Sequence, residues 1–315
     1  MWEIIRQIFP YAIAFTIPLL ITALGGLFSE RSGIVNIGLE GLMVIGFFAS
    51  AAVIIQFQES NATIALLLGL LAGFIAGGIF AILHAFASIS LNADQVISGT
   101  AINMMAGALT LFLARTLTGS GNIAIRMGLP RFDVPWLTQI PVIGPLLFRQ
   151  TYFTTWLVLF ILLISWILLY KTSFGLRLRA CGEHPYAAAS AGINVYRMRY
   201  IAVIISGMLA GLGGATILVT YSGEFTGSVA GLGFLALASL IFGQWKPLGI
   251  LGATFFFGFA STVANVSQVI PELAAIPPVI LKIFPYVVTL IALVLFSKSS
   301  QAPKAVGVHF DLGKK

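Results

Sequence analysis

Long apolar stretches separated by short polar tracts dominate the pattern of this chain. No Asp, Glu, Lys or Arg occurs between Arg6 and Glu30, for example, or between Glu40 and Glu59. About 20 apolar residues in a helix cross a bilayer core about 30 Å thick, and a helix pairs its own backbone groups, as lipid requires. The pattern therefore predicts membrane-spanning helices. The apolar segments lie near residues 8–28, 34–57, 63–90, 96–115, 152–170, 200–221, 227–244, 248–266 and 279–297.

Two of these segments differ from a simple span. Residues 227–244 are short and rich in glycine and could be re-entrant, whereas residues 63–90 exceed one span and could tilt, kink or break. None alternates polar and apolar positions as a membrane barrel would. We therefore expect an all-α polytopic membrane protein of about 8–9 transmembrane helices. The first run is too long for a signal peptide, so we expect it to remain as the first helix.

Composition narrows the functional class. Of 315 residues, 59% are hydrophobic and only 9% are charged, whereas a soluble domain carries about 25% charged residues. The composition therefore disfavours a soluble enzyme, a nucleic-acid-binding module and a disordered regulator. The single cysteine, Cys181, rules out an internal disulfide framework and any CxxC metal site.

The net charge of +7 is more informative about the orientation of the chain in the membrane than about a charged binding partner. Basic residues gather in the tract 171–199 and in the tail 298–315, which the positive-inside rule places in the cytoplasm. We expect a permease domain at 1–297 that contains this tract, followed by the tail. The N-terminus and the loops 57–62 and 118–151 then fall outside. The second loop carries several arginines against the rule, and its prolines suggest a structured cap.

Two stretches resemble each other, LLAGFIAGG at 70–78 and MLAGLGG at 208–214. Glycines recur there at four-residue spacing, in one ladder of Gly69, Gly73 and Gly77 and in a second of Gly207 and Gly211. Small residues let helices in lipid approach closely, so these ladders predict helix packing. The similarity also leaves open an internal duplication, as in many transporters.

Polar residues inside the apolar segments are the candidates for a translocation path. Glu40 is predicted to lie in the second span, with Asn36 one helical turn earlier on the same face. A buried charge needs a partner or water, so these two residues either line the path or serve structure. In the structural alternative, Glu40 pairs with Arg31 or caps a broken helix.

The other candidates leave similar choices open. Asn103 and Asn265 could line a polar path or link two helices, and Tyr221 could face a ligand or water at an external turn beside Glu224. Asp94 is expected to cap the helix that follows it, because an acid favours a helix N-terminus.

Within the basic tract, Pro185 to Gly192 predicts a short helix on the cytoplasmic face. Proline suits the first helical position, alanines favour the helix, and Gly192 suits the position after its end. An uncharged alanine-rich helix is typical of a docking surface, although it could also lie among lipid headgroups. No nucleotide-binding GxxxxGK[ST] motif and no HExxH or GxSxG motif occurs. We expect no catalytic site, no metal site and no cofactor on this chain.

Three stretches together resemble one known family. They read ERSGIVNIGLEGLM at 30–43, DQVISGTAINMMA at 94–106 and GLRLRACGEHPYAAASAGINVYRMR at 175–199. These stretches resemble permease subunits of bacterial ABC importers in the ribose/branched-chain amino-acid superfamily. The chain is most similar to the shorter permease of nucleoside importers that work with a BMP-type lipoprotein, and the resemblance covers nearly its whole length. A riboflavin or sugar permease of the same superfamily is the alternative.

The resemblance implies a multi-pass subunit in the bacterial plasma membrane that forms half of a path for nucleosides. It would pair with a second, longer homologous permease. An ABC ATPase subunit with two cassettes would bind ATP and Mg, and an external substrate-binding lipoprotein would deliver the solute. The short helix would be the coupling helix that fits a groove on the ATPase. Its residues would be His184, Pro185, Tyr186, Ala188, Ala189 and Gly192, and the acid usually found before it is displaced to Glu183.

Two other functional classes are alternatives to this one. An ion-coupled secondary transporter would use Glu40 or Glu224 as its ion site, and a channel or structural subunit would leave the short helix unexplained. The alanine-rich helix in the basic tract favours coupling to an ATPase.

Overall fold

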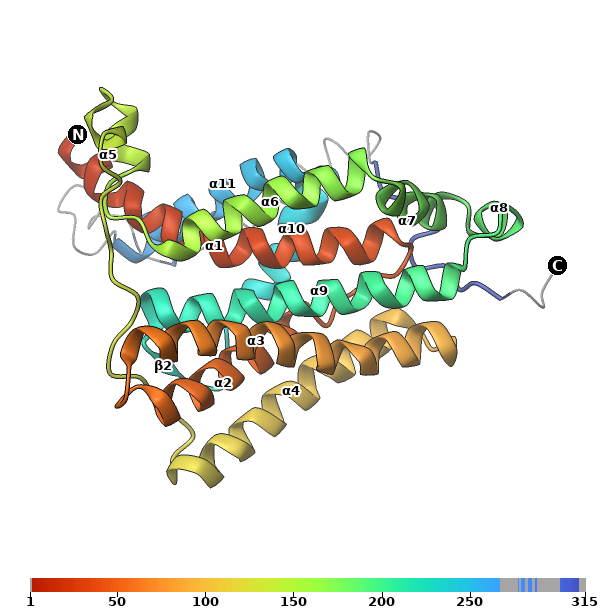
Figure 1. Cartoon of the computed structure of the whole chain (residues 1–315), viewed down its shortest axis with the longest axis horizontal. Helices are drawn as coiled ribbons and strands as arrows, with labels where there is room; N and C mark the ends of the chain where they lie inside the picture. Colours follow the sequence, from red (N-terminus) through yellow and green to blue (C-terminus); the bar gives the residue numbers. More distant parts are fainter. Residues whose placement is uncertain are drawn as a thin grey trace.

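The computed structural model describes residues 2–266 and 301–311, together with residues 277, 279, 280, 283, 284 and 287. Long helices run side by side along one axis, and α4 crosses the others obliquely (Figure 1). Within the described residues, seven helices are long and apolar enough to cross a membrane. The predicted segment 279–297 lies largely outside the described residues.

The elements follow one another in this order along the chain. They are α1 (Trp2–Arg31), α2 (Leu39–Phe57), α3 (Ala62–Ala85), the π-helical turn η1 (Phe86–Ser90), α4 (Gln95–Thr118), β1 (Ile123–Ala124), the 3-10 turn η2 (Leu137–Gln139), α5 (Ile143–Leu147), α6 (Phe153–Lys171), α7 (Ser173–Glu183), α8 (Pro185–Ser190), α9 (Val195–Ile217), the π-helical turn η3 (Leu218–Ser222), β2 (Glu224–Phe225), α10 (Leu232–Phe242) and α11 (Pro247–Val266).

The two segments that differ from a simple span in sequence also differ in the structure. Helix α10 has 11 residues, or about 16 Å at 1.5 Å per residue, so it cannot cross a bilayer alone. The long segment 63–90 changes from α3 into the π-helical turn η1. Helix α9 ends in the same way, in η3.

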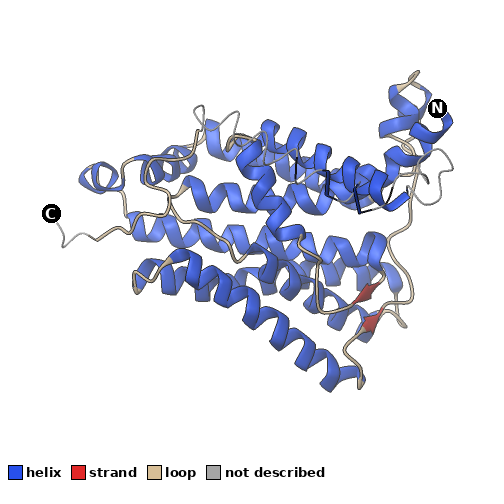
Figure 2. Cartoon of the chain, turned by 180° about the vertical axis from the view of Figure 1, so that it is seen from behind, coloured by secondary structure: helices blue, strands red, loops and turns tan. Residues whose placement is uncertain are grey.

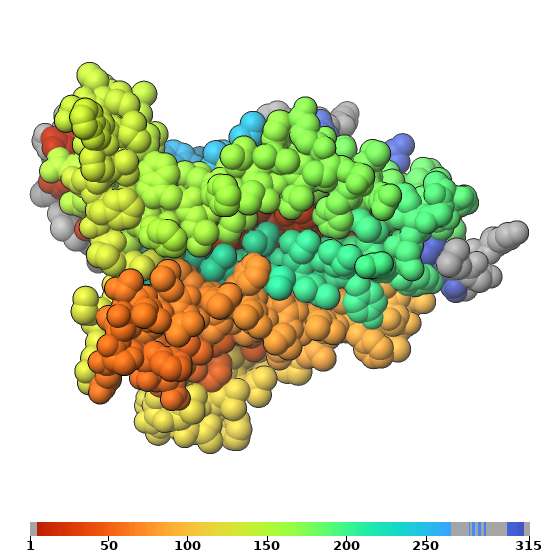
Figure 3. Space-filling view, in the orientation of Figure 1, coloured from red at the N-terminus to blue at the C-terminus, as the bar shows by residue number. Residues whose placement is uncertain are grey.

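Helix α1 forms the centre of the bundle. It packs extensively against α9 and α11 and also contacts α10 and α6. In the space-filling view only small patches of α1 are visible between α6 and α9 (Figure 3). Thr16 and Thr22 are buried within it, and each hydroxyl donates a hydrogen bond to a carbonyl four residues earlier. This local pairing satisfies polar groups that have no water to bind.

The glycine ladders bring α3 and α9 into contact, which confirms the packing prediction. A side chain at Gly77 would collide with the carbonyl of Gly207, and one at Gly211 would collide with the carbonyl of Gly73. Gly46 of α2 meets Gly211 in the same way. Three helices therefore pack through their backbones.

The predicted cap in the segment 118–151 is an ordered structure at the end of the bundle opposite α7 and α8. Strand β1 pairs antiparallel with β2, Ile123 opposite Phe225 (Figure 2). Arg126 forms an ion pair of 2.8 Å with Glu59, so the two predicted external loops meet at this end. The N-terminal part of α1 lies there as well (Figure 1).

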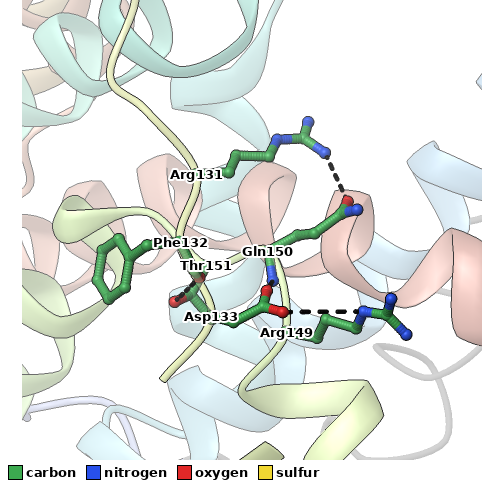
Figure 4. Close-up of polar contacts among 6 residues, drawn as sticks. All are labelled: Arg131, Phe132, Asp133, Arg149, Gln150 and Thr151. Carbon is green, nitrogen blue, oxygen red and sulfur yellow. Dashed lines mark hydrogen bonds and ion pairs between the residues drawn. The ribbon is translucent and has the colours of Figure 1, made fainter. Parts of the chain in front are cut away.

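Two segments of the cap, around residues 131–133 and 149–151, pair antiparallel next to α1. The backbones of Phe132 and Thr151 exchange hydrogen bonds, the backbone N–H of Gln150 donates to Asp133, and Arg131 donates to Gln150 (Figure 4). The Arg131 guanidinium also lies 4.4 Å from the ring centre of Tyr11 in α1. Arginines that oppose the positive-inside rule are therefore held by protein groups in this cap.

Candidate functional site

The turn between α1 and α2, residues 32–38, forms hydrogen bonds with side chains from α3, α4 and α9. It is not helical, because α2 begins at Leu39. The prediction that Asn36 lies one helical turn before Glu40 on a shared face is therefore wrong. Asn36 is buried and donates to the Ser206 hydroxyl of α9 at 2.9 Å.

Side chains from α3 and α4 hold this turn by its backbone. The Gln95 carbonyl oxygen accepts from the N–H of Val35 at 2.7 Å, and His84 Nε2 donates to the carbonyl of Val35 at 3.0 Å. Asn103 accepts from the N–H of Gly41 and donates to the carbonyl of Ile37. Asn103 thus links two elements, which was one of its two predicted roles.

The three stretches that carry the family resemblance meet at this turn. Gln95 and Asn103 come from the second stretch. The third stretch contributes buried Arg199, which donates to the carbonyl of Ser32 at 3.2 Å. A side chain at Gly182 would collide with the carbonyl of Arg31. The shared motifs therefore build one contact region between helices.

Glu40 caps the short helix α10. Its two carboxylate oxygens accept hydrogen bonds from the N–H groups of Gly231 and Gly233, at 2.8 and 2.6 Å. A carboxylate suits a helix N-terminus, where unpaired N–H groups and the helix dipole favour negative charge. This geometry is the predicted capping of a broken helix. Arg31 does not pair with Glu40 and instead donates to the carbonyl of Trp245.

A cavity of about 430 Å³ lies beside α10. Helices α1, α2, α9 and α11 contribute to its wall, together with the loop 226–230 and α10 itself. The Phe15 and Tyr221 rings stack with centres 4.4 Å apart. Polar groups on the wall include Ser228, Ser261 and Asn265. The cavity thus combines an aromatic face with hydrogen-bonding side chains.

Two of the five predicted path residues, Tyr221 and Asn265, line this cavity. The Tyr221 hydroxyl is buried and has no hydrogen-bond partner among the described residues. Asn36, Glu40 and Asn103 lie outside the wall, although Glu40 fixes the helix that carries Leu232 and Leu235 into it. Phe15 was not predicted, because a phenylalanine in an apolar span has no distinctive sequence signal.

The predicted short helix is α8, which occupies Pro185–Ser190 with Pro185 in its first turn. Gly192 has a φ of +80°, a left-handed conformation that suits glycine. Tyr186, Ala187 and Ser190 are exposed, whereas Pro185 and Ala188 are buried. The exposed surface at α8 therefore differs from the predicted set, because it includes Ala187 and Ser190 and excludes Pro185 and Ala188.

Helix α7 precedes α8 and was not predicted. The Thr172 side chain caps it by accepting from the N–H of Gly175. Cys181 of α7 is buried, and this burial raises the pKa of its thiol, with the charge of Arg199 acting in the opposite direction. No group of three His, Cys, Asp or Glu side chains suited to a metal ion occurs in the described part of the chain.

Comparisons with known proteins agree on the class of this chain. Residues 8–293 match the family described as the permease component of branched-chain amino acid transport systems. The guanosine ABC transporter permease protein NupQ of Bacillus subtilis is 46% identical, and the match covers 99% of each chain. The nucleoside ABC transporter permease protein NupC of Lactococcus lactis is 42% identical over 96% of each chain.

A solved structure supports the fold. A metal-chelate type ABC transporter in an inward-facing conformation matches with a TM-score of 0.51 and 16% sequence identity, over 92% of this chain and 85% of its own. The family match, the nearly full-length relatives and the apolar helices lead to one conclusion. The chain belongs to the branched-chain amino acid transport permease family and is a multi-pass permease subunit of an ABC transporter in the plasma membrane.

Proposed function

We propose that this permease forms half of the translocation path of an ATP-driven importer of nucleosides. The observation that carries the substrate class is the pair of relatives named as guanosine and nucleoside permeases, which match over nearly their whole length. The cavity beside α10 is consistent with it. Its volume of about 430 Å³ falls within the range of about 300–1,000 Å³ typical of small-molecule sites.

The cavity wall offers the groups that a nucleoside needs. A purine or pyrimidine base stacks on aromatic side chains, and the Phe15–Tyr221 pair supplies such a face. Sugar hydroxyls and base edges need hydrogen-bonding partners, which Ser261 and Asn265 provide. The lining residues of this cavity carry no charge, so they would contact a passing nucleoside through stacking and hydrogen bonds without holding it by ionic contacts.

Coupling to ATP would enter through α8. An ABC ATPase subunit with two cassettes, which binds ATP and Mg, would receive the exposed face of α8 in a groove. Closure of the cassettes would move α7 and α8 and bias the bundle between two states, outward-open and inward-open. A second homologous permease would complete the path, and an external lipoprotein would deliver the nucleoside.

The test is uptake of labelled guanosine into proteoliposomes that contain both permeases and the ATPase. We expect uptake to require the lipoprotein outside and ATP on the ATPase side. Uptake driven by a proton or sodium gradient without ATP would contradict the proposal. ATP-driven uptake of riboflavin or a sugar, with none of guanosine, would contradict the substrate class alone.

A further inference from the structure

The tail segment 303–310 lies against the cytoplasmic-loop helices and the α1–α2 turn. The N–H of Ala305 donates to the carbonyl of Gly182 in α7 at 2.8 Å, and the N–H of Gly307 donates to the carbonyl of Gly33 at 3.0 Å. One short stretch of tail is thus bonded both to the helix before α8 and to the turn before α2. We call residues 303–310 the strap.

Phe310 anchors the strap at its end. Its side chain is only 2% exposed, and its ring centre lies 5.1 Å from that of Tyr186 in α8 and 5.3 Å from that of Tyr196 in α9. The Tyr196 hydroxyl donates to the carbonyl of Phe310 at 3.2 Å. A buried aromatic ring between two tyrosines stabilises the contact through apolar burial and ring packing.

Arg199 joins the strap to the bundle. The guanidinium donates through Nε to the carbonyl of Ser32 and through Nη1 to the carbonyl of Val308, both at 3.2 Å. Arg199 is also buried. Because an unpaired buried guanidinium is strongly unfavourable, the carbonyls of the turn and the strap stabilise Arg199 in this position. The third nitrogen, Nη2, has no hydrogen-bond partner among the described residues.

These contacts form a continuous connection from α8 to the cavity. The strap binds α8 through Tyr186 and the α1–α2 turn through Gly33. The turn leads directly into α2, where Glu40 caps α10, and α10 lines the cavity. Helices α7 and α9 also contact both α8 and the α1–α2 turn, and the strap adds a further connection between them.

We propose that the strap is a coupling element, in which Phe310 and Arg199 act as positioning residues that transmit movement of α8 to the α1–α2 turn. The inference rests on the proposed coupling of α8 to an ATPase. Without the strap, α8 would still be pushed by the ATPase, but less of its displacement would reach α2 and α10. Transport per ATP would then fall while ATP hydrolysis continued.

The test compares variants of Phe310 in the complete permease–ATPase complex in proteoliposomes, with guanosine uptake and ATP hydrolysis measured together. We expect Phe310→Ala to lower guanosine transported per ATP hydrolysed by about fivefold or more, the scale of typical coupling energies between sites. Phe310→Tyr keeps the ring and is expected to retain coupling. The matched control is Val308→Ala. The Val308 side chain is exposed, and shortening it leaves the backbone carbonyl bond to Arg199 in place.

Phe310→Leu separates coupling from folding, because leucine keeps the buried apolar contact but loses the aromatic packing. An assembled Phe310→Leu complex with reduced transport per ATP supports the strap. Wild-type coupling in both the Ala and Leu variants would overturn it, and so would a parallel loss of assembly, hydrolysis and uptake in both. If the unmodified complex shows no ATP-driven guanosine uptake, the proposed function fails and the strap with it. A failure of the strap alone requires an active unmodified complex.

Discussion

Several buried polar side chains of the described bundle bind the backbone of another element. Asn103 forms hydrogen bonds with the backbones of Ile37 and Gly41, and Arg199 donates to the carbonyls of Ser32 and Val308. A buried backbone group without a partner costs about 1–3 kcal/mol, so these side chains specify how helices and turns meet. A polar residue inside a span is therefore better explained first as a contact between elements, and only then as part of a solute path.

Glu40 gives the sharpest prediction at the residue scale. In Glu40→Gln one oxygen becomes an NH2 donor that faces the N–H of Gly231 or Gly233, so the cap on α10 loses one of its two bonds. We expect a loss of about 1–3 kcal/mol in stability, measured by thermal unfolding of the detergent-solubilised protein. The control Glu59→Gln neutralises an exposed acid and should leave unfolding unchanged. An equal effect of both variants would contradict the capping role.

The sequence identified the residue types of the polar sites but not their partners. The spacing of Asn36 and Glu40 suggested one helix face, and the structure separates them because tertiary bonds hold residues 32–38 as a turn. Asp94 was placed correctly as a cap, since its partners Val96 and Ile97 are local in sequence. The partners that hold this turn lie 49 to 167 residues away in sequence, so local pattern could not reveal them.

At the scale of elements, glycine determines how closely α2, α3 and α9 approach. Span positions followed from the apolar pattern alone, because burial in lipid acts on every residue of a segment. Helix α7 was missed, since its mixed sequence has neither an apolar run nor a strong start signal apart from Thr172. The strap was missed because it is a non-helical stretch with a turn at residues 304–307, and its conformation depends on what it binds.

Gly77→Ala tests the packing between α3 and α9. A Cβ at this position would collide with the carbonyl of Gly207, so the helices must separate, and overpacking of this kind costs about 1–3 kcal/mol. We expect a lower unfolding temperature. Gly107→Ala in α4 is the matched control, because its Cβ would meet no atom within 4 Å. That substitution should be neutral or stabilising, since alanine favours a helix over glycine.

The exposed face of α8 gives a second prediction at this scale. Ala187→Arg places a long charged side chain on that face, so it should block docking and lower ATP-driven uptake at least tenfold without affecting membrane insertion. Ala188 is buried, and Ala188→Arg would therefore disturb the fold as well as docking. Uptake by Ala187→Arg, normalised to the amount of inserted protein, decides the matter. Unchanged uptake would contradict a docking role for α8.

For the whole molecule, the cap formed by the segment 118–151 and the α7–α8 region lie at opposite ends of the bundle (Figure 1). Cysteines at these ends should therefore be labelled from opposite sides of the membrane. The native Cys181 is 0% exposed, and its burial raises the pKa of the thiol, so it should not react with a hydrophilic maleimide near pH 7.

The variants Trp136→Cys and Tyr186→Cys make this measurable, because the native side chains are 83% and 45% exposed. In intact cells a membrane-impermeant maleimide should label position 136 and should reach position 186 only after the membrane is opened. The unmodified protein is the control for Cys181. Labelling of position 186 in intact cells would reverse the predicted orientation.

The cavity yields the prediction about selectivity. Tyr221→Leu removes the aromatic face that stacks on Phe15, and loss of base stacking costs about 1–3 kcal/mol. We expect the concentration of guanosine needed for half-maximal uptake to rise by about 5- to 150-fold on that scale. Tyr221→Phe keeps the ring and should show a much smaller rise. If both variants transport guanosine normally, the cavity is not on the path.

The meeting of the three motif stretches at the α1–α2 turn has a consequence for assigning cargo to other permeases. Residues such as Gln95, Asn103 and Arg199 bind the chain itself, so their presence in a new sequence would report the architecture and say nothing about what is carried. Under the proposed function, cargo preference is expected to depend on the positions equivalent to Phe15, Tyr221 and Asn265, which lie outside those motifs. If the proposal holds, solute differences between related permeases should track these cavity positions more closely than the shared motifs.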